Sequence, residues 1–111
     1  MKIDKTLMSG STTMLLLTLL SEKDMYGYEM IETLKDRSQN VFELKAGTLY
    51  PLLHTLEDKK YLTVCEKEVT GKVRKYYSIT KEGKKILSQK QEEWKTYTAA
   101  VTQVMSMGGA V

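Results

Sequence analysis

Hydrophobic residues recur at helical spacing in four stretches of the chain. In residues 4–21, leucine and methionine fill so many positions that the predicted helix is buried on most of its girth. A shorter amphipathic stretch covers residues 26–35, and residues 47–60 place four leucines at i, i+3, i+4 and i+7. The longest stretch begins at a capping Thr80 and continues to about residue 107, where a glycine pair would stop it. The pattern therefore predicts four helices.

The chain also contains segments with the composition of β-strands. Residues 62–69 and 73–80 are rich in valine, threonine, tyrosine and isoleucine, and they flank a glycine-bearing turn with a basic tip. We expect these two segments to pair as an antiparallel hairpin. Residues 41–44 predict one more short strand, between the second and third helices. If the third helix begins near Gly47 or Thr48, Pro51 lies at the end of its first turn, where at most one hydrogen bond is lost.

The order of these elements is that of a mainly α (α+β) fold, a winged helix-turn-helix with a two-stranded wing. Residues 1–80 would form the winged domain, and residues 81–111 a long helix packed with it as one compact unit. The apolar stripe along this helix is longer than a 111-residue monomer can cover, so it predicts a dimer. The predicted interface comprises Leu7, Leu87, Gln91, Trp94, Tyr97, Thr98, Val101, Val104 and Met105.

Composition narrows the class of protein. A chain of 111 residues with 41% hydrophobic and 28% charged residues is one globular domain. Its uncharged stretches fall short of the ~20 apolar residues of a membrane span. The N-terminus lacks a small-residue cleavage site and the single Cys65 agrees with a reducing compartment, so we expect a cytoplasmic protein. No nucleophile–base pair, paired carboxylates, phosphate loop or metal cluster is present, and we expect neither an enzyme nor a cofactor.

Positive charge is concentrated in one part of the chain. The net charge is only +3, but residues 59–90 hold ten basic and three acidic residues. A surface that meets a polyanion would produce this asymmetry, and so would a lysine-rich, solvated helix face. From charge alone both interpretations remain open.

The third helix has an outward face suited to DNA. Its leucines share one side, and the residues that point away are mostly short: Gly47, Thr48, Pro51, His54 and Thr55. Thr48 and the N-terminal N–H groups can donate to phosphate oxygens, while His54 or Thr55 could reach base edges. Tyr50 flanks this face. The basic wing residues Lys72, Arg74 and Lys75 would rest against the adjacent minor groove or its phosphates.

Three motifs give the chain a resemblance to a known family. They are Tyr26-Gly27-Tyr28-Glu29, Lys45-Ala46-Gly47-Thr48-Leu49-Tyr50-Pro51-Leu52-Leu53, and Arg74-Lys75-Tyr76-Tyr77-Ser78-Ile79-Thr80 followed by Gly83. In this order and spacing they resemble a PadR-family transcriptional regulator of the short-tailed subgroup, whose single last helix makes the dimer. The resemblance implies a homodimeric repressor that binds a palindromic operator in double-stranded DNA. It also implies release by a small molecule, as in some members.

The resemblance also implies roles for single residues. The DNA contacts it implies are Tyr26, Lys45, Thr48, Tyr50, Pro51, Lys72, Arg74 and Lys75. In multidrug-binding members, a tryptophan on the last helix and its two-fold mate sandwich a flat aromatic drug, and Trp94 is similar to that tryptophan. Leu7, Met14 and Thr98 would then line the cavity. Thr98 stands where the drug-binding pattern has an acid, so a preference for cations is not indicated.

Some of these signals have a second interpretation. Trp94 would serve equally as a dimer-core aromatic without any ligand. His54 lacks a partner for catalysis or metal binding and is expected to face solvent or DNA. Cys65 is expected to be a half-buried strand residue rather than a thiol sensor. The alternative function is a ligand- or protein-binding dimeric sensor without DNA binding. A hydrophobic dye would then quench the fluorescence of Trp94, and the protein would not shift its own promoter fragment.

Overall fold

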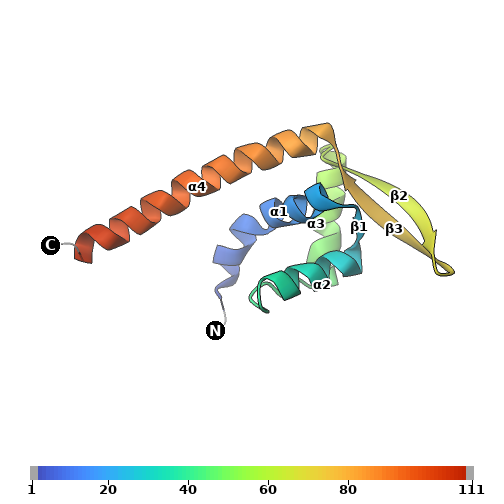
Figure 1. The fold of residues 1–111 in the computed structure, drawn as a ribbon, viewed down its shortest axis with the longest axis horizontal. Helices are drawn as coiled ribbons and strands as arrows, with labels where there is room; N and C mark the ends of the chain where they lie inside the picture. The colour runs from blue at the N-terminus through green and yellow to red at the C-terminus, as the bar shows by residue number, and fades with distance from the viewer. Residues whose placement is uncertain (1–2, 110–111) are drawn as a thin grey trace.

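The computed structural model describes residues 3–109 and has the predicted winged helix-turn-helix fold (Figure 1). In chain order the elements are α1 (Lys5–Glu22), β1 (Met25–Tyr26), α2 (Gly27–Arg37), α3 (Ala46–Asp58), β2 (Leu62–Val69), β3 (Lys72–Ile79) and α4 (Lys81–Gly109). The molecule is elongated, 63 × 31 × 21 Å, because α4 projects from one end and the β2–β3 hairpin from the other. Residues 1–2 of the predicted winged domain and residues 110–111 of the predicted last helix lie outside the described residues.

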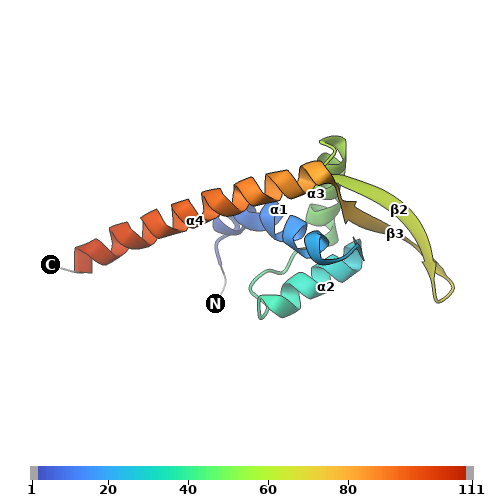
Figure 2. The same ribbon diagram turned by 45° about the horizontal axis from the view of Figure 1, so that its top comes forward.

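A core of leucine and methionine lies among the first three helices and the base of the sheet. Leu16 of α1, Met30 of α2 and Leu53 of α3 have no solvent exposure at all. From the sheet, Met25 and Tyr77 are buried in the same cluster. Figure 2 shows α4 running alongside α1, so the start of α4 closes one side of this core. The helical spacing thus correctly identified the buried residues of α2 and α3, whereas α1, predicted to be buried on most of its girth, has its buried leucines only in its second half.

The three strands form one antiparallel sheet in the order β1-β3-β2. In the predicted hairpin Val69 pairs with Lys72, which leaves Thr70 and Gly71 as a two-residue turn. Both turn residues have positive φ, 50° and 79°, as a type I′ hairpin turn requires. The hairpin is confirmed, with β3 beginning one residue earlier than predicted.

The prediction of a strand at residues 41–44 was wrong. These residues are a non-helical connection in which Phe42 and Leu44 pack against the core, and the Phe42 N–H donates to Ser38 Oγ at 2.9 Å. The third strand is instead β1, which precedes α2 and pairs through Tyr26 with Tyr76. Isolated apolar residues produced the error, because a core-facing loop and a short strand show the same local pattern.

Three smaller predictions also needed correction. Because α3 begins at Ala46, Pro51 lies in the second helical turn and leaves the Gly47 carbonyl without its N–H partner. The helix α4 includes the glycine pair and ends at Gly109. Cys65 is exposed rather than half-buried, because it lies on the uncovered face of the sheet.

The start of α4 is hydrogen-bonded to, and packed against, the residues that follow α3. The Thr80 hydroxyl donates to the Lys60 carbonyl at 2.7 Å and accepts the Gly83 N–H at 3.0 Å, which confirms Thr80 as the cap. Gly83 has no room for a side chain, because a Cβ there would lie 2.7 Å from Ile79 Cγ1 and closer still to the Tyr61 carbonyl oxygen. We expect these contacts to set the direction in which α4 leaves the domain. None of the helices described here is long and apolar enough to cross a membrane.

Candidate nucleic-acid interface

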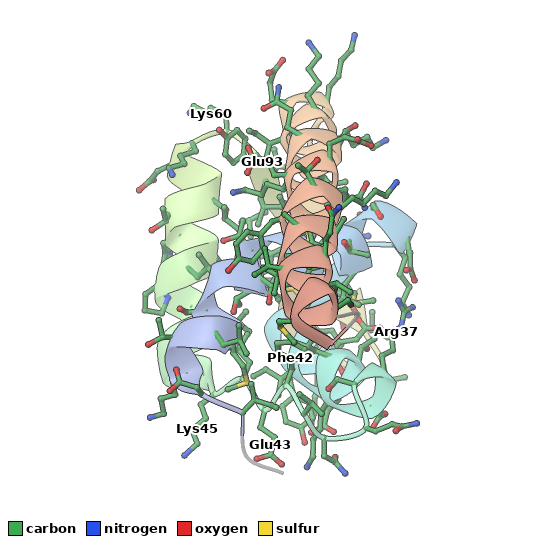
Figure 3. The ribbon with its side chains drawn as sticks, turned by 90° about the vertical axis from the view of Figure 1, so that its left-hand side faces the viewer. Arg37, Phe42, Glu43, Lys45, Lys60 and Glu93 are labelled. Carbon is green, nitrogen blue, oxygen red and sulfur yellow. The ribbon has the colours of Figure 1, made fainter. Side chains whose placement is uncertain are left out.

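The exposed face of α3 is polar and bears short side chains. Leu49, Leu53 and Leu56 are buried on the opposite face, as the spacing predicted. The residues predicted to point away are all exposed: Gly47, Thr48, Pro51, His54 and Thr55. Lys45, the N-cap of α3, is also exposed and lies at the opposite end of the helix from Lys60 (Figure 3). The helix can therefore approach a groove with little side-chain bulk in the way.

Tyr50 is held in place by the start of α2. Its ring lies on Gly27, where an added Cβ would be 2.7 Å from Tyr50 Cζ and closer to its hydroxyl oxygen. The glycine of the Tyr26-Gly27-Tyr28 motif therefore leaves space for a residue 23 positions later in the chain. Sequence reasoning did not assign this role to Gly27, since only the packing of α2 against α3 reveals it.

A hollow of about 410 Å³ lies where α2, α3 and the wing meet. It is lined by Tyr26, Gly27, Tyr28, Tyr50, Arg74 and Lys75. Four of these six were predicted DNA contacts, and the structure brings them together from three separate segments. The Glu32 carboxylate raises the pKa of Tyr28 above its ordinary value, first through a hydrogen bond and second through its charge. The hollow thus combines two cations with tyrosine hydroxyls and the uncapped start of α2.

The outer face of the sheet carries a ladder of cations and aromatic rings. The Arg74 guanidinium carbon lies 4.2 Å from the centroid of the Tyr26 ring, and Tyr26 meets Tyr76 edge-on at 5.4 Å. Lys67 Nζ lies 5.1 Å from the centroid of the Tyr76 ring and 3.4 Å from Asp24 Oδ2. Lys67 and Asp24 were not predicted. The only signal for Lys67 was its alternation with Cys65 and Val69, which places it on this face once the register is known.

The three predicted basic residues of the wing do not share one face. Lys72 adjoins the turn and is exposed, on the same face as Arg74. Lys75 projects to the other face, where its cross-strand partner is Glu66. The wing therefore presents positive charge on both sides rather than along a single row.

A second hollow, of about 750 Å³, separates the first half of α1 from α4. Leu7, Met14 and Trp94 line it together, as predicted for a ligand cavity, with Asp4, Thr6, Gly10, Lys90, Glu93 and Tyr97 as further lining residues. Thr98 does not line it, because its hydroxyl turns back to donate to the Trp94 carbonyl at 2.8 Å. The charged residues of this hollow were not predicted, since they become neighbours only when α1 packs on α4.

The residues of the predicted dimer interface fall into two groups. Leu87 is buried in the core of its own chain. Of the others, Trp94, Tyr97, Val101, Val104 and Met105 of α4 are exposed, as is Leu7 of α1. Gln91 is exposed as well, and Thr98 is half-buried. Among the described residues, α4 therefore carries an uncovered, mainly apolar face.

Comparison with known proteins decides the family. Residues 16–89, more than half of the chain, match the profile of the "Transcriptional regulator PadR-like family". The chain belongs to this family. Like the Clostridium thermocellum transcriptional regulator, whose structure it matches with a TM-score of 0.83 and 32% identity over 89% of this chain and 97% of that one, this PadR-like protein has a winged-helix fold. It is a DNA-binding transcriptional regulator and not an enzyme.

Two further relatives agree with the assignment. An uncharacterized protein of Lysinibacillus sphaericus is 40% identical over 86 residues, which span 77% of this chain and 79% of that protein. Transcriptional regulator YqjI of Escherichia coli is 30% identical over 84 residues, 76% of this PadR-like chain. That match spans only 39% of the Escherichia coli protein, so this chain corresponds to less than half of that protein's length.

Proposed function

We propose that this PadR-like protein is a homodimeric repressor that binds a palindromic operator through α3 and the wing. The observation that carries the proposal is the pairing of an exposed, short-chain face on α3 with an adjoining hollow that contains Arg74 and Lys75. Helix α3 would enter the major groove, while phosphates would lie against the hollow and against Lys72 at the wing tip. Lys45 would contact the backbone at the N-terminal end of α3.

A dimer supplies the second half of the proposal. The uncovered apolar face of α4, together with Leu7 of α1, is the surface that a second copy would bury. Two-fold symmetry would then place the paired α3 helices in successive major grooves, ~34 Å apart. Val104→Asp puts a charge into this face without touching the core. We expect it to yield folded monomers by sedimentation velocity with an unchanged helical circular-dichroism spectrum, whereas a dimer of unchanged affinity would contradict this interface.

The DNA contacts are tested by mobility-shift titration. Lys72→Ala with Arg74→Ala should weaken operator binding and lower the slope of log affinity against log salt by about 4, because each of the two subunits loses two phosphate contacts. Tyr50→Phe keeps the ring on Gly27 and removes only the hydroxyl. It therefore separates the loss of a hydroxyl contact with the DNA backbone from the loss of packing within the protein. Lys95→Ala is the matched control, since this lysine lies on α4 beside Glu92 and away from the wing. Unchanged affinity in the double variant would refute the wing contact.

We also propose that a small, flat aromatic ligand releases the protein from DNA. The 750 Å³ hollow suits such a ligand, because Trp94 and Tyr97 lie 6.3 Å apart by ring centroids and offer aromatic surface to it. Asp4 and Glu93 bring carboxylates and Lys90 an ammonium to the same lining. A ligand wedged here would change the angle between the two α4 helices, and with it the spacing of the α3 pair.

One titration tests this release mechanism. A planar dye is added to the protein–operator complex while Trp94 fluorescence and DNA release are followed together. Quenching and release should have the same midpoint. Release without quenching would remove Trp94 from the mechanism, and quenching in a protein that never shifts its promoter would favour the ligand-binding sensor instead.

A further inference from the structure

Two cations face each other across the wing. Lys67 of β2 is the direct cross-strand partner of Arg74 of β3, so both side chains leave the sheet on its outer face. Like charges in this arrangement repel, and a hairpin normally avoids them. Their juxtaposition therefore needs a compensating arrangement.

The compensation is a pair of tyrosine rings, one for each cation. Arg74 reaches from β3 over Tyr26 of β1, and Lys67 reaches from β2 over Tyr76 of β3. Both therefore lean across one strand towards β1, because the strand order is β1-β3-β2. Asp24 directly precedes β1, and its Oδ2 accepts a hydrogen bond from Lys67 Nζ at 3.4 Å.

We infer that Lys67 is a positioning residue for Arg74. Asp24 holds the Lys67 ammonium over the ring of Tyr76, which lies two residues after Arg74 on β3. From this position Lys67 repels the Arg74 guanidinium away from β2. Arg74 then stacks on the ring of Tyr26, which Lys67 leaves free. In this position Arg74 lines the same hollow as Tyr50. The inference rests on the proposed function, in which Arg74 contacts DNA.

Lys67 is suited to this role rather than to a phosphate contact of its own. Its charge is already matched by the Asp24 carboxylate, and its stem lies along a ring. The pair is partly exposed on both sides, so it orients the lysine without adding much to folding stability. Arg74 has no acidic partner among the ion pairs of the described residues, and its charge stays available.

The first test uses the free protein and needs no DNA. Protons on Arg74 Cδ should be shifted upfield in the NMR spectrum by the ring current of Tyr26, and Tyr26→Leu gives the unshifted reference. Lys67→Gln should move these protons towards that reference, whereas Lys67→Arg, which can still stack and pair with Asp24, should keep them shifted. Lys95→Gln is the control for loss of one positive charge. Shifts that stay unchanged in Lys67→Gln would overturn the inference.

The second test is a double-mutant cycle on operator affinity. Lys67→Gln should weaken binding about five- to thirtyfold, the size expected when each of the two subunits loses one exposed cation–π contact. It should have no further effect in an Arg74→Gln background, and Lys67→Arg should restore the affinity. Additive losses with a salt slope lower by about 2, one phosphate contact in each subunit, would show that Lys67 contacts a phosphate itself, which would overturn the inference. If Arg74→Gln alone leaves affinity unchanged, the proposed DNA contact fails and the NMR test still decides whether Lys67 positions Arg74.

Discussion

The helices α1 and α4 each have one part that is covered by the chain and one part that is not. In α1, Leu16 is 0% exposed whereas Leu7 is 62% exposed. In α4, Leu87 is 7% exposed whereas Val104 and Met105 are 74% and 73% exposed. The covered part of α4 adjoins the winged domain, and its uncovered part extends beyond it (Figure 1). The same two helices thus close one core and present a second apolar surface.

This difference shows that apolar periodicity identifies the residues that become buried, but not whether their own chain or a second chain covers them. The stripe of α4 continues with unchanged spacing from the half that is buried within the chain to the half that is not. Contiguous uncovered apolar surface of this kind marks an interaction site in a stable protein. In α4 the boundary lies just beyond Leu87, since residues 91–97 are all exposed, so intramolecular packing ends there and the proposed intermolecular packing begins.

The largest test of this comparison is a matched pair of leucine substitutions in α1. Leu16→Ala should lower the free energy of unfolding by about 2–5 kcal/mol, because it opens a cavity in a fully buried position. Leu7→Ala removes the same atoms from an exposed position and should change the stability of dilute monomer by less than about 0.5 kcal/mol. Urea unfolding followed by circular dichroism measures both.

Protein concentration sharpens the result. At concentrations where the chain is dimeric, Leu7→Ala should also become destabilising, because the contact it loses lies between subunits. Leu16→Ala should cost about the same at every concentration. Equal and concentration-independent losses at the two positions would mean that both halves of α1 belong to one core.

A smaller effect is expected at the joint between the winged domain and α4. Gly83→Ala places a Cβ against the Tyr61 carbonyl and Ile79, which are backbone and packed side chain rather than a flexible tip. Overpacking of this kind costs about 1–3 kcal/mol, so the midpoint of urea unfolding should fall. Because α4 must tilt to relieve the contact, operator affinity should fall as well in a mobility-shift titration. A variant as stable as the parent, with unchanged affinity, would show that the joint does not set the direction of α4.

Patterns repeated over several turns or residues predicted the structure well. The leucines of α3 and the Thr80 cap were identified correctly, because each follows from spacing within one element. The two-residue strand β1 was missed, since so short a strand has no period to detect. Tyr26 was assigned to a helix because its strand partner, Tyr76, lies 50 positions later in the sequence.

The candidate site was predictable as a set of residue types but not as an arrangement. The basic wing residues and the α3 face could be named from the motifs. The Asp24–Lys67 pair joins residues 43 positions apart and depends on the register of the hairpin, which periodicity alone leaves open. The contact between Gly27 and Tyr50 likewise depends on how α2 crosses α3. Interactions between elements, rather than within them, are what sequence patterns leave undetermined.

The smallest expected effect has the opposite sign and bears on what fills the 750 Å³ hollow. Gly10 lies in α1 on the lining of this hollow, and a Cβ there would meet nothing within 4 Å. Gly10→Ala should therefore raise the free energy of unfolding of dilute monomer by about 0.5–1 kcal/mol, because alanine favours the helix. If the hollow stays open for a ligand in the dimer, the dimer dissociation constant measured by sedimentation equilibrium will not change. A weaker dimer would mean that the partner's backbone approaches Gly10, and Trp94 would then be a core aromatic of the dimer rather than a ligand platform.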